Sequence, residues 1–268
     1  MKRENTVCGR MEQEVTVNRV FRAESYILRH DRLLWIVPVL YCAVGVYAGF
    51  YDHAVMDIYE GLELFSLPEI MNIFFPFSAA AVTGYVIGGD FSRRTIQNVL
   101  SVGTDKKHYF YSRLLVQGVV TGALFTVTGL IHVICHWFWP QGNSDIRIEF
   151  LWQKLLVYMT VALLQLLASV SVINAVCYFV KNQLVAIGFG IGLVYLELII
   201  YQAAEINGMG AVQALADFFP TNVLRNIFAY AVYDRVFTGE FFQYGLSAIL
   251  VIAVSSAAGY VRFCYDRD

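Results

Sequence analysis

Six long apolar runs constrain the fold of this chain more than any other feature. A helix needs about 20 apolar residues to cross the ~30 Å hydrocarbon core of a membrane. The runs reach or approach that length and are Leu33–Tyr51, Glu69–Gly89, Leu114–Trp139, Leu155–Val180, Leu184–Tyr201 and Gly245–Phe263. Lipid offers no partner to a free backbone N–H or C=O, and continuous runs of this length favour helices over barrel strands. We therefore expect an all-α membrane protein with six transmembrane helices.

The distribution of positive charge predicts the orientation of these helices. If the chain crosses six times, 15 of its 19 Lys and Arg residues fall on one side, and the other four are Arg147, Lys154, Arg225 and Arg235. Because Lys and Arg collect in cytoplasmic loops, both termini are predicted to be cytoplasmic. The expected location is the bacterial inner, or plasma, membrane. The overall charge of −2 argues against nucleic-acid binding.

The segments outside the six runs predict further helices. We expect residues 1–32 to form a cytoplasmic tail with an amphipathic helix at the lipid surface, and residues 33–268 to form one domain. The predicted tail helix includes Phe21, Glu24 and Arg29, with Phe21 on its apolar face and Arg29 pointing elsewhere. A solvated helix or a disordered tail are the alternatives. The loop 202–244 is long enough for two short outer helices, Ala211–Phe219 and Val223–Val236. Thr221 or Asn222 is the expected cap of the second one.

The loop after the second run has the pattern of a short amphipathic helix. Asp90 or Ser92 is the expected N-cap and Gly103 the expected end. An apolar strip of Ile96, Val99 and Leu100 is flanked by polar and basic residues, which include Arg93, Arg94, Gln97 and Asn98. Such a helix suits the groove of a cytoplasmic partner, although the basic residues serve equally well to set topology and contact anionic lipid.

The same loop carries a family resemblance. It reads Asp90-Phe91, then Thr95-Ile96-Gln97-Asn98-Val99-Leu100-Ser101, then Lys106-Lys107 and Arg113-Leu114-Leu115. This order resembles the first cytoplasmic loop of ABC type-2 permeases. The sequence departs from the family pattern at Arg94, where Gly is usual, and at Gln97, where Lys or Arg is usual.

The resemblance implies a pore formed by two permease copies, a homodimer, with two separate ATPase subunits bound to it. The loop helix would then be the coupling helix, with docking residues Asp90, Phe91, Arg93, Arg94, Thr95, Ile96, Asn98, Val99 and Leu100. ATP and Mg²⁺ would bind to the partner ATPase, because no phosphate-binding G-x-x-x-x-G-K-[ST] motif is present here. This chain would be a non-catalytic subunit that binds no cofactor or metal itself.

Polar residues inside the runs are candidates for a substrate path. Glu197 in the fifth run is costly at membrane depth, unless it lies near enough to the outer surface to reach water. Gln165 and Asn174 in the fourth run either bond neighbouring helices or line a cavity. His132 and His136 share a helix face but lack a third metal ligand, and nearby tryptophans place them at the interface.

Glycine pairs four residues apart predict close contacts between helices. Four such pairs lie in the apolar runs, at Gly45/Gly49, Gly84/Gly88, Gly118/Gly122 and Gly188/Gly192. Small residues at this spacing allow two helix backbones to approach each other within a membrane.

Taken together, these features favour the membrane subunit of an ATP-driven exporter of amphipathic peptides such as toxins or antimicrobial peptides. The peptide cargo follows from the resemblance alone. Export of lipids or hydrophobic drugs is the alternative cargo. Two other classes remain open: a membrane sensor without transport, and an intramembrane enzyme that uses His132, His136 and Glu197.

Overall fold

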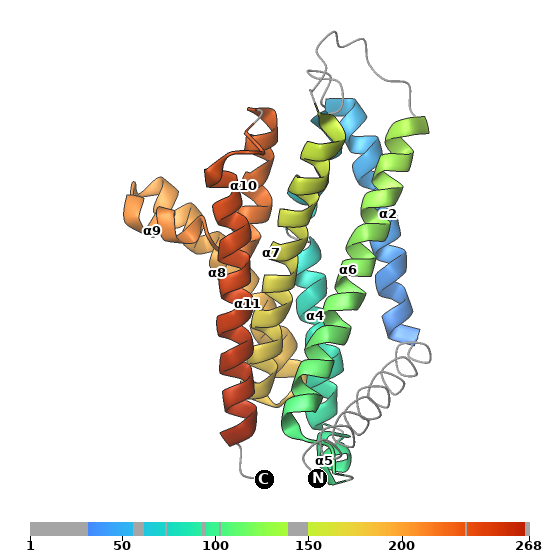
Figure 1. Ribbon diagram of the computed structural model, residues 1–268, viewed down its shortest axis with the longest axis vertical. Helices are drawn as coiled ribbons and strands as arrows, with labels where there is room; N and C mark the ends of the chain where they lie inside the picture. The colour runs from blue at the N-terminus through green and yellow to red at the C-terminus, as the bar shows by residue number, and fades with distance from the viewer. Residues whose placement is uncertain are drawn as a thin grey trace, which may run out of the picture.

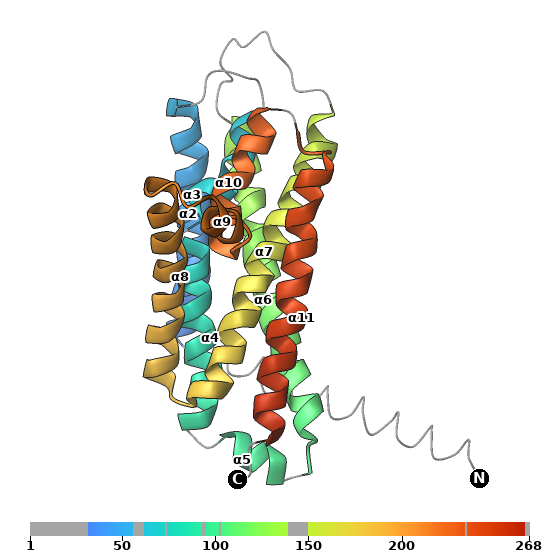
Figure 2. The ribbon, with the colours of Figure 1, turned by 90° about the vertical axis from the view of Figure 1, so that its left-hand side faces the viewer.

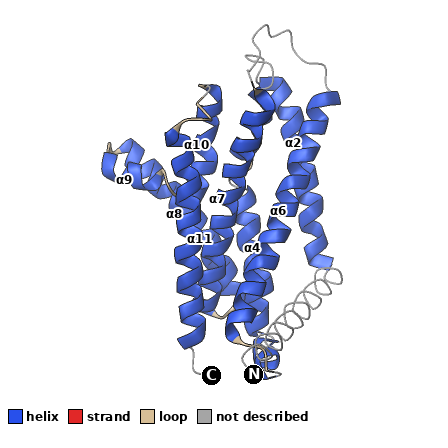
Figure 3. Cartoon of the chain, viewed as in Figure 1, coloured by secondary structure: helices blue, strands red, loops and turns tan. Residues whose placement is uncertain are grey.

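The computed structural model of this chain is a bundle of helices (Figure 1). It describes residues 32–55, 62–72, 74–92, 95–101, 103–138, 150–233 and 235–265, and all regular structure within these ranges is helical (Figure 3). Six long helices run along one axis: α2 (Arg32–Val55), α4 (Phe74–Ser92), α6 (Lys106–Phe138), α7 (Leu151–Val180), α8 (Gln183–Ile206) and α11 (Gly239–Tyr265) (Figures 1 and 2). The predicted all-α fold is confirmed. The predicted tail helix, with Phe21, Glu24 and Arg29, lies outside the described residues.

Five shorter elements lie at the two ends of this bundle. One end carries α5 (Thr95–Ser101); the other end carries η1 (Leu62–Phe65), α3 (Leu67–Ile70), α9 (Gly210–Ala216) and α10 (Pro220–Val232) (Figures 1 and 2). We call these the α5 end and the α10 end. Helix α9 projects sideways from the bundle at the α10 end (Figure 1).

Four helices in the described residues are long and apolar enough to cross a membrane, namely α6, α7, α8 and α11. Helix α2 adds a shorter apolar stretch, Trp35–Phe50. Large apolar side chains such as Leu115, Ile199 and Leu250 are exposed on the outside of the bundle. In water such exposure is unfavourable, whereas in a bilayer the lipid tails cover it. The chain is thus a multi-pass membrane protein.

The second apolar run is broken, and the prediction of one helix over Glu69–Gly89 is wrong in this respect. Helix α3 ends at Ile70 and α4 begins at Phe74. Pro76 explains the break, because it has no N–H to donate to the carbonyl four residues earlier. The preceding segment turns into the bundle, where Phe65 and Leu67 are buried and the Tyr158 hydroxyl donates to the Phe65 carbonyl at 2.7 Å.

Two separate hydrophobic clusters stabilise the two ends. At the α10 end, Phe75, Tyr158 and Phe241 lie in a cluster that includes residues of η1, α3 and α10. At the α5 end, the second cluster joins α5 to α6, α7 and α11 through Ile96, Phe110, Tyr178 and Phe263. Helix α5 therefore packs in one core, and η1, α3 and α10 share the other.

Two of the four predicted glycine pairs make close helix contacts. A Cβ added at Gly84 would lie 2.7 Å from Ile187 Cγ1, and one at Gly88 would lie 2.7 Å from the Cα of Gln183, so α4 and α8 approach closely here. Gly45 and Gly49 likewise allow α2 to pack against α6. A Cβ at Gly118 or Gly122 would make only ordinary contacts, and Gly188 and Gly192 on α8 face open space, with no described atom within 4 Å of an added Cβ.

Candidate functional site

Helix α5 lies against the bundle with its apolar strip turned inward. Ile96 is 5% exposed, and Val99 and Leu100 pack on the same cluster. Gln97 and Asn98 are exposed on the opposite side. Gly103, with a φ of +92°, follows the helix and donates its N–H to the Leu100 carbonyl at 3.0 Å, as expected for a helix end. The surface that α5 presents to a partner is therefore polar, and its apolar side fixes it to this chain.

Asp90 is not the N-cap of α5 but part of a buried polar network, so the capping prediction is wrong. Its carboxylate forms an ion pair with Arg113, and both side chains are almost fully buried. The Tyr109 hydroxyl donates to Asp90 Oδ2 at 2.9 Å and accepts from Arg113 Nε at 3.2 Å. Desolvation makes a buried charge costly unless it is paired and hydrogen-bonded, and this network supplies both. Asp90 and Arg113 thereby join the end of α4 to the start of α6.

Ser92 also has another role than the predicted cap. Its hydroxyl donates back to the Gly88 carbonyl at 3.1 Å within α4. Phe91 contacts the Tyr178 ring edge-on, with 5.5 Å between the ring centres. Thr95 is half-buried at the start of α5. Arg93 and Arg94 lie outside the described residues.

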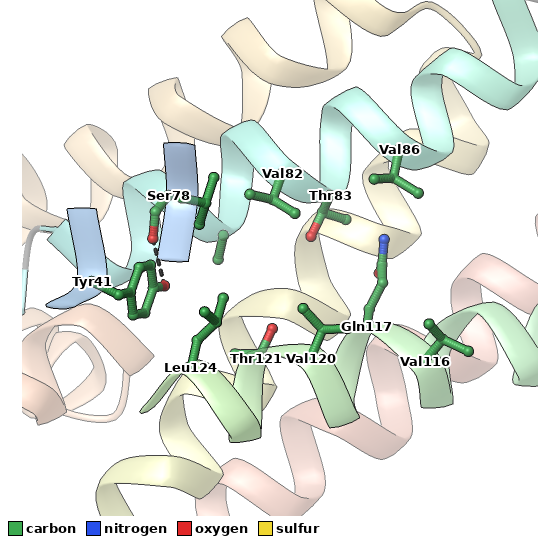
Figure 4. Close-up of a pocket in the computed structure, with 12 residues that line it drawn as sticks. Tyr41, Ser78, Val82, Thr83, Val86, Val116, Gln117, Val120, Thr121 and Leu124 are labelled. Carbon is green, nitrogen blue, oxygen red and sulfur yellow. Dashed lines mark hydrogen bonds between the residues drawn. The ribbon is translucent and has the colours of Figure 1, made fainter. Parts of the chain in front are cut away.

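Beyond this network, α4 and α6 are separated by a small cavity (Figure 4). The cavity measures about 30 Å³ and lies between α2, α4 and α6. Its walls are mainly apolar, but Gln117 extends from α6 toward Thr83 and Val86 of α4 (Figure 4). The Gln117 amide is buried, and neither its oxygen nor its nitrogen has a hydrogen-bond partner among the described residues. Helices α4 and α6, which flank α5, are thus joined by the Asp90–Arg113 pair next to α5, and a cavity separates them further along the bundle.

Positive charge gathers around the α5 end. Lys181 lies in the tight turn between α7 and α8, with a φ of 55°, and Asn182 caps α8 by accepting from the backbone N–H groups of Leu184 and Val185. Partial burial, together with the nearby Arg262 and Lys106, lowers the pKa of Lys181 below its usual 10.5. Three elements therefore bring basic residues to one end, as expected for a cytoplasmic surface.

Glu197 holds the two helices of the α10 end on α8. Its carboxylate accepts from the backbone N–H of Thr221 at 3.2 Å, which satisfies a free donor in the first turn of α10. The Asn222 side chain donates to the carbonyls of Glu197 and Ala216, at 3.3 and 3.0 Å. The prediction that Thr221 or Asn222 caps α10 is wrong. The N-cap position is Phe219, and its side chain forms no capping hydrogen bond.

The other polar candidates lie between helices. Gln165 Nε2 donates to the Tyr244 carbonyl at 2.6 Å and to Ser247 Oγ at 3.2 Å, joining α7 to α11. Asn174 is fully buried, and its amide has no hydrogen-bond partner in the part of the chain that the structure describes. Gln165 thus contacts α11 and Glu197 contacts α10, and no hydrogen bond between described residues joins Gln165, Asn174 and Glu197 to one another.

The two histidines are buried on α6, the helix that packs against α2, whereas Glu197 contacts α10. In the described ranges no three His, Cys, Asp or Glu side chains come together as a metal site. The contacts of these residues thus give no support to an intramembrane enzyme.

Sequence reasoning missed the roles of Arg113, Tyr109 and Gln117. Arg113 had been read as a topology signal, yet a basic residue at the start of a long apolar run also suggests a buried counter-ion for Asp90. No local signal marks Tyr109. A lone glutamine such as Gln117 at the inner edge of a run is a signal, since polar groups in lipid need partners.

The fold and the loop geometry define a multi-pass helical membrane protein with a short helix at one end of the bundle. A family model described as ABC-2 family transporter protein matches residues 20–197. The chain therefore belongs to the ABC-2 family and is the membrane component of an ABC transporter. The family implies partnership with an ABC ATPase. A comparison with curated proteins gives no match.

Proposed function

We propose that this chain is the permease subunit of an exporter, and that the exposed side of α5 is the docking site of the ATPase. The observation that carries the proposal is the position of α5. Its polar side, with Gln97 and Asn98, is open to a partner, while Ile96 lies in the core of the α5 end. A force on α5 therefore reaches α4 and α6 through packed side chains.

The Asp90–Arg113 pair gives this transmission a defined route. It joins α4 to α6 directly beside α5, and the cavity around Gln117 leaves the two helices less tightly packed above that point. Packed elements tend to move as rigid bodies between discrete arrangements. We infer that movement of α5 tilts α4 relative to α6 about the buried pair.

The proposed arrangement includes six membrane crossings with both termini in the cytoplasm. Helices α2 and α4 run alongside the four long apolar helices (Figures 1 and 2), and the basic residues around Lys181 favour a cytoplasmic α5 end. The ATPase would then meet α5 on the side where ATP is available.

A second copy of the chain completes the proposed pore. The outer surface of α8 is apolar, with Phe189 and Leu196 exposed, and Gly188 and Gly192 open the same helix to close approach. Small residues four apart are a common contact between membrane helices. These features support a homodimer that binds two ATPase subunits.

Amphipathic peptides are the proposed cargo. The support is the resemblance in size and loop pattern to small peptide-export permeases, together with an interior that places polar groups such as Gln117 among apolar side chains. Lipids and hydrophobic drugs are the competing cargo, and the same mixed lining suits them.

Site-specific crosslinking tests the docking proposal. The chain would be co-expressed with candidate ABC ATPases from the same organism, carrying a photoreactive residue at position 98 or, as the matched control, at position 212 on α9. We expect the ATPase to crosslink from position 98 and not from position 212. Crosslinking from both positions or from neither would contradict the assignment of α5.

The cargo is tested in cells. Deletion of the gene should sensitise the host to a cationic amphipathic peptide, or leave such a peptide inside the cell, and the complemented strain should recover. If the deletion changes the accumulation of a lipid or hydrophobic dye and of no peptide, the cargo assignment is wrong while the docking site stands.

A further inference from the structure

The α10 end contains an open cleft that the coupling proposal does not use. It measures about 570 Å³ and lies among α8, α9, α10 and α11. Four tyrosines, one carboxylate and one guanidinium dominate its lining: Tyr201, Tyr230, Tyr233, Tyr244, Asp217 and Arg225. We call this cleft the tyrosine cup. A cleft of this size has the volume of a small-molecule site.

Three aromatic rings at the cup are in contact with one another. The edge of Tyr230 meets the face of Tyr244, or the reverse, with 5.7 Å between ring centres and 83° between ring planes. Phe218 contacts Tyr244 in turn, with 5.9 Å between ring centres. Tyr233 is 72% exposed, so its ring remains available to a ligand. Aromatic ring faces carry negative potential and attract organic cations.

Asp217 supplies a full negative charge beside these rings. Its carboxylate makes no ion pair with any described residue, and the only hydrogen bond to it from a described residue comes from Asn226 Nδ2 at 3.4 Å. Desolvation raises the pKa of its carboxyl above the usual 3.8. A carboxylate that is partly desolvated and lacks a counter-ion gains from a cation placed next to it.

Arg225 does not fill that role. Its guanidinium lies over the Tyr201 ring, 5.6 Å from the ring centre, and its side chain is exposed to solvent. It thus engages one tyrosine and leaves Asp217, Tyr230, Tyr233 and Tyr244 to another cation.

An apolar surface adjoins the cup. Met209, Val212 and Leu215, on or next to α9, are between 41% and 66% exposed. A short helix with exposed apolar residues that projects from the bundle (Figure 1) is suited to the membrane surface. A ligand in the cup can therefore place an apolar part against α9.

We infer that the tyrosine cup binds the ammonium group of an amphipathic cation, with the charge between Asp217 and the tyrosine rings and the apolar part along α9. The inference deepens the proposed function and rests on it in one respect, that the α10 end faces outward. A lysine side chain of a peptide and the ammonium headgroup of a lipid share this chemistry.

Calorimetric titration of the full chain in phosphatidylglycerol nanodiscs, which contain no lipid ammonium, tests the inference. The probes are an amphipathic peptide with one lysine and the same peptide with acetyl-lysine; empty nanodiscs give the background. We expect the lysine peptide to bind roughly tenfold more tightly, since a hydrogen bond to a charged group is lost on acetylation. Equal binding of both peptides would overturn the inference.

Matched variants locate the site. Asp217→Asn keeps the shape of the side chain and should abolish the preference for lysine, whereas Glu205→Gln removes an exposed carboxylate of α8 outside the cup and should not. Tyr233→Leu should weaken binding by about two- to fivefold, and Tyr233→Phe should not, because phenylalanine keeps the ring face. Equal binding by Asp217→Asn and the parent chain would refute the cup as the site.

Two further titrations distinguish a peptide lysine from a lipid headgroup as the ligand and measure how binding depends on pH. In phosphatidylethanolamine nanodiscs, weaker binding of the peptide by the parent chain but not by Asp217→Asn would show that lipid headgroups also occupy the cup. Acidification should weaken binding as the Asp217 carboxylate is protonated, at a pH above that for an exposed Asp because its pKa is raised. The titration needs neither ATPase nor transport, so its failure would leave the coupling proposal intact, and loss of ATPase crosslinking would leave binding to the cup intact.

Discussion

The two ends of the bundle fix a short helix in different ways. At the α5 end, the buried carboxylate of Asp90 is neutralised by Arg113 and hydrogen-bonded by Tyr109, beside the apolar strip of α5. At the α10 end, the half-buried carboxylate of Glu197 meets no such cation in the described residues and accepts from the backbone of α10. The carboxylate at the α5 end is thus paired with a guanidinium, and the carboxylate at the α10 end is bonded to the N-terminus of α10.

The difference follows from what each end has to do in the proposed cycle. A buried ion pair is costly to break, so it keeps α4 and α6 joined while α5 is pushed. The bonds between α8 and α10, from the Thr221 N–H to the Glu197 carboxylate and from the Asn222 side chain to the Glu197 carbonyl, involve no ion pair and are each weaker than the buried pair. We therefore expect substitutions at the α5 end to have the larger effects.

The largest effect is expected from Asp90→Ala. This change leaves the Arg113 guanidinium buried without its counter-charge, which costs about 3–5 kcal/mol for buried pairs. Thermal unfolding of the purified chain in nanodiscs measures it. The double variant Asp90→Leu/Arg113→Met should recover much of the lost stability. An Asp90→Ala chain as stable as the parent would show that the pair contributes little.

A smaller loss is expected from Gly84→Ala, at the contact between α4 and α8 that connects the two ends. The new methyl group would lie 2.7 Å from Ile187 Cγ1 and 3.0 Å from its backbone nitrogen, so the helices must separate. Overpacking of this kind costs about 1–3 kcal/mol. Gly188→Ala on the open side of α8 is the matched control and should leave thermal unfolding of the monomer unchanged. Equal losses in both variants would remove the distinction between closed and open glycines.

Glu197→Ala should cost less again, about 0.5–2 kcal/mol, the range for the loss of a helix cap. Hydrogen exchange locates the change: the amides at the start of α10 should exchange faster, while those of α5 keep their rate. Glu197→Gln retains an acceptor oxygen and should show a smaller increase. Faster exchange in α5 would mean that the two ends are not independent.

At the α5 end, Tyr109→Phe should have an effect between those of Asp90→Ala and Glu197→Ala. This change removes one hydrogen bond to Asp90 and one from Arg113 but keeps the ion pair and the ring, so about 0.5–1.5 kcal/mol is lost per bond, or about 1–3 kcal/mol in all. Thermal unfolding of Tyr109→Phe and of Asp90→Ala, each compared with the parent chain, gives the two losses of stability. If Tyr109→Phe is as damaging as Asp90→Ala, the network depends on the hydroxyl rather than on the pair.

The sequence predicted the helices better than it predicted their partners. Apolar runs predicted where the long helices lie, because lipid requires continuous backbone bonding. However, α6 and α11 begin 8 and 6 residues before the predicted runs, and the second run is broken before Pro76. The α5 helix was anticipated from the spacing of Ile96, Val99 and Leu100, but which way that strip faces depends on the packing of α6, α7 and α11. The bonds of Asp90 and Glu197 could not be predicted for the same reason: an ion pair with Arg113, or a bond to Thr221, joins residues 23 or 24 positions apart.

The central claim is that α5 transmits the motion of the ATPase because its apolar side is fixed in the core. Export of peptide and hydrolysis of ATP, measured together in proteoliposomes that contain the complex, test it most directly. Ile96→Asp places a charge in that core and should lower the amount of peptide exported per ATP hydrolysed, while Ile96→Val should keep it. The account is contradicted if Ile96→Asp inserts, binds the ATPase and exports peptide with the ratio of the parent complex.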